Sequence, residues 1–256
     1  MRLVTALCGV LLLAACAAPA PAPAGPPASA APTPRSPAPT PGLCGDPGLD
    51  DKQVAFPSGH GTFLAGYLLG TGDVTLVLAP QASATGCSWL AWAKGKAAAG
   101  YRVLAFDFNG EGRSPRADTG HGSDDVTAAV AFARTAGSGR VVLAGASRGA
   151  TATLIAAARL DPPPAAVISL SGPGDYAGES ARAAVPKLTA PVLYVAATGD
   201  SAFATAARSM YDATPGERRK LVLVPGSLHG TGLLTITAEG TAEATRAVDD
   251  FLRTIA

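Results

Sequence analysis

The sequence has little of the features that mark several common classes of protein. Its 256 residues carry 20 Lys and Arg against 19 Asp and Glu, a net charge of +1. Nucleic-acid-binding proteins normally concentrate basic residues on one face, so this balance argues against a nucleic-acid partner. The chain has only three histidines and four cysteines, and it contains no HExxH motif or other grouping of His with carboxylates. We therefore expect neither a metal site nor a cofactor.

The first sixteen residues contain a hydrophobic run that is too short to cross a membrane. Arg2 is followed by thirteen apolar or small residues, 3–15, whereas a spanning helix needs about 20. The run therefore predicts a cleaved signal segment over residues 1–16. It ends in Leu-Ala-Ala-Cys, which resembles the bacterial lipobox, a motif whose cysteine is acylated and becomes the new amino terminus. We predict lipidation of Cys16 and a cell-envelope lipoprotein anchored to the membrane. An ordinary secretory signal is the alternative, and it also exports the chain.

Proline and alanine dominate the next segment, residues 17–42. Ten of these 26 residues are Pro, nine are Ala, and Arg35 is the only charge. Such a composition has few side chains to bury and no regular hydrogen-bonding period, which predicts an extended, disordered spacer. A tether of this kind would hold an anchored domain clear of the membrane, although a segment without a role is also compatible with the sequence. The folded domain is then 43–256.

Two cysteines remain for the folded domain once the signal segment is set aside. Cys8 lies in the hydrophobic run and Cys16 is the predicted lipid site, which leaves Cys44 and Cys87. An even number of cysteines in an exported chain predicts a disulfide between them. Metal binding by two isolated cysteines without a nearby histidine is the weaker alternative.

Strand-like and helix-like segments alternate along the folded domain, which has 18 basic and 19 acidic residues. We predict strands at 52–56, 62–69, 73–79, 101–106, 140–144, 165–170, 192–197 and 220–224. We predict helices at 87–99, 123–136, 148–159, 178–185, 202–212 and 238–254. Strands that are apolar on both faces and alternate with helices indicate an α/β fold with a mostly parallel, eight-stranded sheet and helices on both faces. The first two strands add an antiparallel amino-terminal hairpin.

One segment, Gly145-Ala146-Ser147-Arg148-Gly149, fits the G-x-S-x-G pattern of a nucleophile elbow. The bare pattern is weak, but a predicted strand precedes it and a predicted helix follows it. Such a turn holds the serine in a strained, exposed position, and the flanking Gly145 and Gly149 avoid clashes there. It also directs the Arg148 amide, near a helix amino terminus, toward the reacting oxygen. Ser147 is therefore the predicted nucleophile. A tight turn with a surface serine is the alternative.

A serine nucleophile needs a general base, and His229 is the best placed of the three histidines. His60 lies in the hairpin turn and His121 precedes a helix, whereas His229 follows the last predicted strand. A parallel sheet collects catalytic groups at the carboxyl ends of its strands. We therefore predict that His229 meets Ser147. The alternative is that His229 is a loop histidine without a catalytic role.

Two carboxylates are placed to orient that histidine and to stabilise its charged form. Asp200 follows the predicted strand 192–197 in a Thr-Gly-Asp-Ser turn, and Asp175 follows the preceding strand. We favour Asp200, because Asp175 lies in a Gly- and Pro-rich turn where Asp commonly begins a helix. The predicted catalytic order along the chain is Ser147, Asp200, His229.

These motifs resemble those of the α/β-hydrolases, in particular small exported esterases and dienelactone-hydrolase-like proteins. The resemblance runs from about Thr62 to the carboxyl terminus and rests on four segments: GASRG, FDFNGEGRS at 106–114, ATGDS and SLHG. It implies that the second oxyanion-hole amide comes from the loop after LVLAP, which by position is the backbone N–H of Gln81. The chain departs from the family in having Ala79-Pro80 where His-Gly is common. It also has Ser147 where dienelactone hydrolases proper use Cys, which favours ordinary ester chemistry.

The function favoured by these residues is a serine hydrolase that cleaves a small carboxylic ester through a Ser-His-Asp triad and an acyl-enzyme. Only residues 171–190 separate two consecutive strands where larger relatives insert a lid, so we expect an open site without a sizeable lid. An acyltransferase or a peptidase would use the same triad. A non-catalytic, surface-tethered binding protein of the same fold is a rival from another class, which the intact Ser, Asp and His set disfavours.

Four further residues have structural interpretations. We expect Asp107 and Arg113, in the segment FDFNGEGRS, to shape their loop rather than to take part in catalysis. We expect Trp89 and Trp92 to belong to the core, although aromatic residues in that helix could also line an acyl pocket. The sequence leaves the oligomeric state open.

Overall fold

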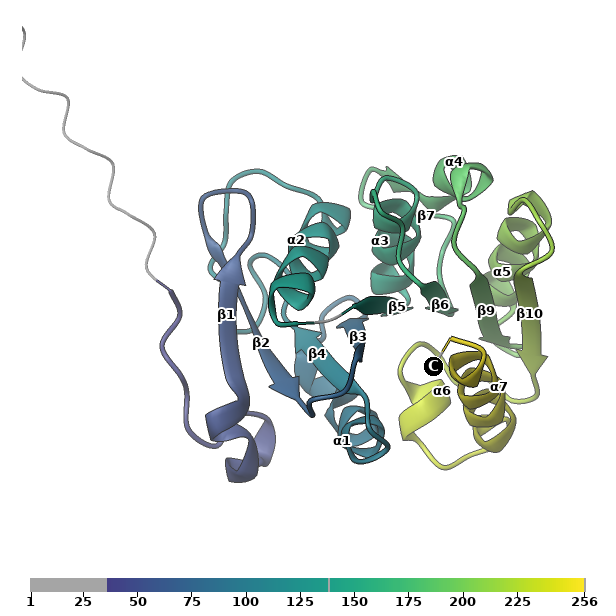
Figure 1. Ribbon diagram of the computed structural model, residues 1–256. Helices are drawn as coiled ribbons and strands as arrows, with labels where there is room; N and C mark the ends of the chain where they lie inside the picture. Colours follow the sequence, from purple (N-terminus) through teal and green to yellow (C-terminus); the bar gives the residue numbers. More distant parts are fainter. Residues whose placement is uncertain (1–35, 138, 256) are drawn as a thin grey trace, which may run out of the picture. The chain divides into compact units, whose positions relative to one another are not determined.

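The computed structural model describes residues 36–137 and 139–255, drawn in colour in Figure 1. The predicted signal segment, its Cys16 and most of the predicted tether lie outside these described residues. Part of the tether, 36–42, is described and touches the domain. The Thr40 N–H donates to Gln53 Oε1 at 2.9 Å, and Gln53 Nε2 donates to the Thr40 carbonyl at 2.8 Å. Contact with the domain therefore begins a few residues before the predicted boundary at 43.

An eight-stranded sheet forms the centre of the domain (Figure 1). In order across the sheet, the strands are β1 (Gln53–Pro57), β2 (Phe63–Leu69), β4 (Arg102–Phe106), β3 (Val74–Ala79), β5 (Arg140–Ala146), β6 (Ala166–Leu170), β9 (Val192–Ala197) and β10 (Arg219–Val224). The pairs β1–β2 and β2–β4 are antiparallel, and all pairs from β4 to β10 are parallel. The prediction of a mostly parallel sheet with an antiparallel amino-terminal hairpin is confirmed.

The direction in which the chain crosses the sheet changes at β3. From β3 the chain passes to β4 on one side and then returns to β5 on the other side of β3, where Val77 pairs with Leu143. Loops that leave the carboxyl ends of β3 and β5 therefore diverge to opposite faces. Such a switch point is where open α/β sheets bind ligands and place catalytic groups.

Helices cover both faces of this sheet (Figure 1). They are α1 (Leu90–Ala98), α2 (Gly122–Thr135), α3 (Arg148–Ala157), α4 (Ala181–Ala184), α5 (Ser201–Ala213), α6 (Gly232–Thr235) and α7 (Thr241–Arg253). One core cluster joins α2, α3, α4 and α5 to one face of the sheet, and the other joins α1, α6 and α7 to the opposite face. Strands β3, β6 and β9 are buried along their whole length, because helices lie on both sides of them.

Both tryptophans belong to the core. Trp89 is 0 % exposed and Trp92 is 7 % exposed, and their rings lie 5.7 Å apart in the cluster beneath α1. The prediction that they pack in the core, rather than line an acyl pocket, fits this placement.

The helix boundaries differ from the prediction at three places. The helix predicted at 87–99 opens with a 3-10 turn over Gly86–Trp89, and α1 follows. The helix α2 begins at Gly122 with His121 as its N-cap, and Asp124 Oδ2 accepts the His121 N–H at 2.9 Å instead of capping the helix itself. The last helix begins at 241 rather than 238, because Gly240 has φ 84° and interrupts the helical backbone. The four-residue helix α6 was not predicted.

The predicted disulfide is present between Cys44 and Cys87, whose Cα atoms lie 5.4 Å apart. It joins the 3-10 turn Leu43–Gly45 to the 3-10 turn that precedes α1. The start of the domain is thereby tied to the loop that follows β3, which is the loop expected to carry the second oxyanion amide.

The segment between β6 and β9 is short. It holds only the two-residue strands β7 (Asp175–Tyr176) and β8 (Glu179–Ser180), helix α4 and a 3-10 turn at Val185–Lys187. The segment 178–185, predicted as one helix, therefore contains strand β8 followed by helix α4. Within 36–137 and 139–255, none of the helices has the length and apolar character that a membrane crossing requires.

Candidate functional site

The GASRG segment forms a sharp turn between β5 and α3. Ser147 has φ 51° and ψ −119°, an unusual backbone conformation for a residue with a side chain. Its N–H donates to the Leu170 carbonyl at 2.8 Å, and its carbonyl accepts the Ala150 N–H at 2.9 Å, which begins α3. A strained serine between a strand and a helix is the geometry of a nucleophile elbow.

Two glycines allow the close approaches that this elbow requires. A Cβ on Gly145 would lie 2.3 Å from the Gly149 carbonyl oxygen, and a Cβ on Gly149 would lie 2.3 Å from the Ala79 carbonyl oxygen. Any larger residue at either position would push the chain apart. The elbow is therefore packed directly against the loop that follows β3.

Ser147 is only 9 % exposed, so the prediction of an exposed serine is wrong. The reason is that neighbouring loops pack on both sides of the elbow. Ala79 and Pro80 lie against Gly149, and a Cβ on Gly230 would lie 3.5 Å from Ala146 Cβ.

A histidine and a carboxylate form a pair at the carboxyl ends of the next strands. His229 Nδ1 lies 2.7 Å from Asp200 Oδ2, and the two side chains are 33 % and 15 % exposed. Asp200 directly precedes α5 after strand β9, and His229 follows strand β10. The short distance and the partial burial suit a carboxylate that orients an imidazole.

Asp175, the other carboxylate considered from the sequence, has a different environment. It lies in β7, its side chain is 58 % exposed, and its Oδ2 lies 3.1 Å from Arg182 Nε. The carboxylate that lies at hydrogen-bond distance from His229 is therefore Asp200.

The loop after β3 and the histidine loop are joined by the side chain of Gln81. Its Oε1 accepts the Thr231 N–H at 3.1 Å and lies 3.2 Å from Thr231 Oγ1. His229 is two residues before Thr231, so this contact holds the histidine loop against the loop expected to carry the oxyanion amide. This side-chain role could not be predicted from the sequence, because the two residues are 150 positions apart.

Arg148 has a fixed side chain beside the elbow. It is the first residue of α3, so its backbone N–H belongs to the free amino end of the helix. Its Nη1 donates to Glu111 Oε1 at 2.5 Å, and its Cζ lies 4.1 Å from the centre of the Phe108 ring. These contacts tie the elbow to the loop that follows β4.

Phe203 is a further neighbour of the histidine. Its ring centre lies 4.3 Å from that of His229, and the rings meet edge to face. The residue lies in the first turn of α5, three positions after Asp200, so the helical spacing i, i+3 could have pointed to it.

The remaining histidines lie elsewhere, around the amino end of α2. His60 Nε2 is 3.6 Å from Asp124 Oδ2, and His121 is the N-cap of the helix. Among the residues that the structure describes, no group of three or more His, Cys, Asp or Glu side chains could hold a metal ion.

Asp107 organises the loop after β4, in agreement with the prediction that it shapes this loop. Asp107 is 3 % exposed, and its carboxylate accepts the Gly86 N–H at 2.8 Å and the Arg113 N–H at 3.0 Å. Burial raises the pKa of Asp107, and the two N–H donors oppose that rise. The guanidinium carbon of Arg113 lies 5.9 Å from the Tyr67 ring. Both residues shape the loop.

One buried carboxylate was not singled out by the sequence. Asp125 in α2 is 2 % exposed, and its Oδ2 accepts the Asn109 N–H at 2.8 Å. Burial raises the pKa of Asp125 to about 6, although that hydrogen bond and the charges of His60 and Arg148 lower it in part. A raised carboxyl pKa near a cleft marks a candidate functional group.

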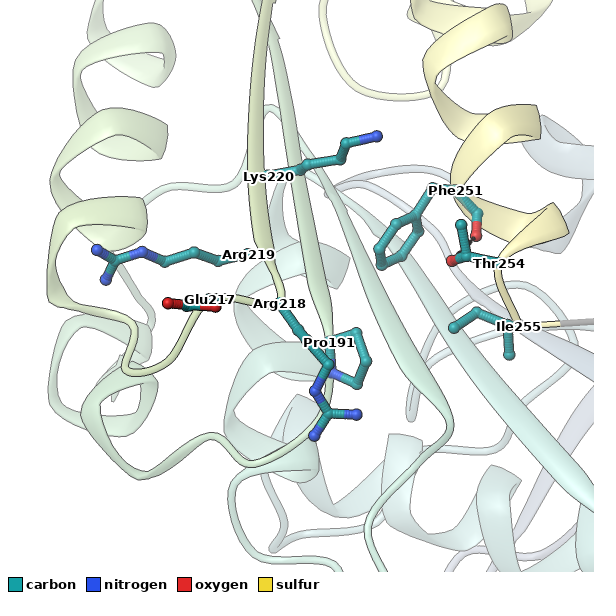
Figure 2. Close-up of a pocket in the computed structure, with 8 residues that line it drawn as sticks. All are labelled: Pro191, Glu217, Arg218, Arg219, Lys220, Phe251, Thr254 and Ile255. Carbon is teal, nitrogen blue, oxygen red and sulfur yellow. Dashed lines mark hydrogen bonds between the residues drawn. The ribbon is translucent and has the colours of Figure 1, made fainter.

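Two cavities lie at opposite ends of the parallel strands, one at their amino ends and one at their carboxyl ends. One cavity, of about 340 Å³, lies between the amino ends of β9 and β10 and the end of α7. Figure 2 shows its lining residues, with Lys220 extending from its strand toward the side of α7. None of the predicted catalytic residues lines it. A second cavity, of about 350 Å³, is lined by Arg148 together with the loop after β4 and the β7–β8 turn. Of the residues predicted for the site, Arg148 alone lines this second cavity, and Ser147, Asp200, His229 and Gln81 do not.

Comparison with known structures identifies the fold. No family model and no curated protein sequence matches the chain. Dienelactone hydrolase from Anabaena variabilis is 23% identical, with a TM-score of 0.64, over 78% of this chain and 95% of that one. Monoacylglycerol lipase from Paleococcus ferrophilus is 15% identical, with a TM-score of 0.65, over 75% and 99% of the two chains. The esterase RhEst1 from a Rhodococcus species is 16% identical, with a TM-score of 0.66, over 80% and 100%. The chain has the fold of the α/β-hydrolase superfamily.

Proposed function

We propose that the protein is a serine hydrolase that cleaves a carboxylic ester. The observation that carries the proposal is the pair formed by His229 and Asp200 at 2.7 Å, in a loop that packs against the strained Ser147 elbow. A nucleophile, a base and an orienting carboxylate are the three roles that acyl transfer by a serine requires.

The proposed reaction begins with attack of Ser147 Oγ on the ester carbonyl carbon while His229 Nε2 takes the hydroxyl proton. Asp200 accepts the Nδ1–H of the imidazolium and stabilises its charge. The negative charge that develops on the carbonyl oxygen is stabilised by the backbone N–H groups of Gln81 and Arg148, the latter at the amino end of α3.

The tetrahedral intermediate then collapses. The ester C–O bond breaks, the alcohol leaves with the proton from His229, and the acyl group remains on Ser147. Water attacks this acyl-enzyme with His229 again as the base, which releases the carboxylic acid and restores the serine. Besides the ester and one water molecule, both halves of the reaction use groups of this chain.

The names of the structural neighbours support an ester over other acyl compounds. They include proteins described as esterases and as a monoacylglycerol lipase. The short segment between β6 and β9 supports small or protruding esters, because it offers little chain to enclose a long acyl group.

Kinetics with p-nitrophenyl esters of increasing chain length test the proposal. We expect turnover that is highest for short chains, and a loss of about 10³-fold or more in kcat for Ser147→Ala. Ser209→Ala, an exposed serine of α5, serves as the matched control and should keep full activity. Turnover that survives in Ser147→Ala would overturn the proposal, and transfer of the acyl group to an added alcohol in place of water would make the protein an acyltransferase.

We further propose that the protein acts outside the cytoplasm, anchored to the membrane through lipid on Cys16. The support is the hydrophobic run 3–15, its Leu-Ala-Ala-Cys end and the Pro- and Ala-rich segment that follows. The Cys44–Cys87 disulfide agrees with export, because disulfides persist in oxidising compartments.

A further inference from the structure

The side chain of Gln81 lies between the loop that supplies the proposed oxyanion amide and the loop that carries the proposed base. Its Oε1 accepts the Thr231 N–H at 3.1 Å and the Thr231 hydroxyl at 3.2 Å. Thr231 is only 5 % exposed, so water has little access to these two donors. Because buried donors are costly to leave unpaired, the two hydrogen bonds hold the amide oxygen and the turn together.

Gly230 provides the space for this amide oxygen. It has φ 56°, which favours glycine, and a Cβ at this position would lie 2.3 Å from Gln81 Oε1. The same Cβ would lie 3.5 Å from Ala146 Cβ, one residue before Ser147. The Gln81 oxygen therefore packs against both residues that follow His229, beside the end of β5 that leads to the nucleophile.

The backbone of His229 belongs to the same turn. Its carbonyl accepts the Gly232 N–H at 3.0 Å, and the Gly230 carbonyl accepts the Leu233 N–H at 3.2 Å. On its other side, the imidazole contacts Asp200 and Phe203 at the start of α5. The histidine is thus held from one side through its ring and from the other side through its backbone, where the fixed point is the contact with Gln81.

We propose that Gln81 is a positioning residue for the base: its side chain fixes the turn 229–231 and thereby the place of His229 relative to the oxyanion amide. The inference rests on the proposed function, in which the Gln81 backbone N–H stabilises the oxyanion and His229 takes the proton. One residue then supplies a catalytic amide and holds the turn of the base, so a single side chain sets the distance between these two parts. A misplacement of about 1 Å in such a site can cost about 10²-fold in rate.

Kinetics of three variants with p-nitrophenyl acetate test this role. Gln81→Leu removes the acceptor and keeps much of the side-chain volume, and it should lower kcat by about 10- to 100-fold with little change in KM, because the base acts in the transition state. Gln81→Glu retains an acceptor oxygen and should restore most of the lost kcat. A Gln81→Glu protein as slow as Gln81→Leu would count against the proposal.

Gln53→Leu is the matched control. Gln53 is the other glutamine of the chain, and its side chain likewise joins two separate segments, through hydrogen bonds with Thr40 at 2.9 and 2.8 Å. It lies in the edge strand β1, away from the elbow and the histidine. The control should keep the kcat of the parent protein, and equal kcat in Gln81→Leu and Gln53→Leu would overturn the proposal.

A change on the other side of the contact tests it without altering Gln81. Thr231→Val removes the hydroxyl donor and keeps the N–H, so it should lower kcat in the same direction but less, by about 2- to 10-fold. The loss in the double variant Gln81→Leu/Thr231→Val should be smaller than the product of the two single losses, because both changes remove one contact. Fully multiplicative losses would contradict a role exerted through Thr231.

Proton NMR of the folded proteins separates positioning from a general loss of stability. The short contact between His229 Nδ1 and Asp200 should give a far-downfield proton signal, which His229→Ala assigns by its absence. We expect this signal to shift or broaden in Gln81→Leu and to stay unchanged in Gln81→Glu and in Gln53→Leu. An unchanged signal in Gln81→Leu would show that the side chain does not hold the imidazole, and would overturn the proposal.

Failure of this inference and failure of the proposed function give different results. Equal kcat in Gln81→Leu and Gln53→Leu, with Ser147→Ala inactive, would remove the positioning role and leave the serine hydrolase. A wild-type protein that turns over no ester would refute both, because there would be no reaction for which His229 is positioned.

Discussion

Single residues carry the proposed chemistry through a few short contacts. His229 lies 2.7 Å from one carboxylate oxygen of Asp200, and its ring meets Phe203 edge to face. Hydrogen bonding on one side and ring contact on another restrict the imidazole to few orientations. A base that is already oriented avoids the cost of ordering it during the reaction.

The choice between two acidic residues can be tested directly. Asp200→Asn should lower kcat for p-nitrophenyl acetate by about 10³- to 10⁴-fold, because the amide no longer stabilises the imidazolium or selects its tautomer. Asp175→Asn should change kcat little, since that carboxylate is exposed and pairs with Arg182. Steady-state kinetics of the two variants decide the matter. A large loss in Asp175→Asn together with a small one in Asp200→Asn would refute the assignment.

The buried Asp125 predicts a pH dependence of stability. In the unfolded chain the carboxyl ionises near its ordinary pKa of 3.8, whereas in the folded protein its pKa is about 6. Its stabilising effect is therefore fully present below pH 4 and is lost as the pH rises through 6, by about 3 kcal/mol. Asp125→Asn has no such proton to lose, so its free energy of unfolding relative to the wild type should increase between pH 4 and pH 7.

Urea unfolding at a series of pH values measures this difference. The raised pKa of Asp107 acts in the same direction in both proteins and cancels in the comparison. If the free energy of unfolding of the wild type and of Asp125→Asn changes equally with pH, the raised pKa of Asp125 is contradicted.

Some of these residues could be found from the sequence and others could not. The placement of Ser147, Asp200 and His229 could be predicted, because each follows a strand of a parallel sheet and such strands end on the same side of the sheet. The side-chain role of Gln81 and the burial of Asp125 depend on contacts between distant loops, for which a single sequence has no local signal. The 9 % exposure of Ser147 was missed for the same reason.

At the scale of secondary-structure elements, the elbow depends on close packing between α3 and the loop after β3. A Cβ on Gly149 would lie 2.3 Å from the Ala79 carbonyl oxygen and 2.6 Å from that of Pro80. Backbone atoms cannot rotate out of the way as a side chain does, so the loop itself would have to shift. That loop carries Gln81.

Gly149→Ala should therefore affect both stability and activity. We expect a loss of about 1–3 kcal/mol in the free energy of unfolding from overpacking, together with a reduced kcat because the Gln81 amide moves. Gly95→Ala, in α1, is the control: in the described structure its Cβ would meet no atom within 4 Å, and Ala is favoured over Gly in a helix. Denaturant unfolding and ester kinetics on both variants provide the check. Equal behaviour of the two variants would contradict the packing argument.

The elements themselves were largely predictable, and their ends were not. All eight strands of the sheet were predicted, because continuous apolar segments bounded by Gly, Pro and Asp are a strong local signal. The late start of α7 depends on the positive φ of Gly240. The helix α6 has only four residues, which is too short for a periodic pattern.

At the scale of the whole molecule, different features lie at the two ends of the parallel strands. The carboxyl ends of the parallel strands hold the elbow, the pair of His229 and Asp200, and the cavity lined by Arg148. The amino ends of β9 and β10 hold the cavity drawn in Figure 2. The disulfide and the bonds of Thr40 to Gln53 join the start of the described chain to the domain.

Anchoring through Cys16 is a prediction about the full-length chain. Expressed in a bacterial host that processes lipoproteins, the protein should be found in the membrane fraction, and Cys16→Ser should release it to the soluble fraction or the medium. Cys8→Ser, in the same hydrophobic run, is the matched control and should stay with the membrane. Equal fractionation of the two variants would count against lipidation of Cys16.

The central claim is that Ser147 is an activated nucleophile. A fluorophosphonate probe reacts covalently with such a serine, and mass spectrometry of the digested protein locates the label. We predict a single label on the peptide that contains Ser147, absent from Ser147→Ala and slowed in His229→Ala, because the imidazole no longer takes the proton. Folded wild-type protein that stays unlabelled, or a label that persists in Ser147→Ala, would contradict the claim.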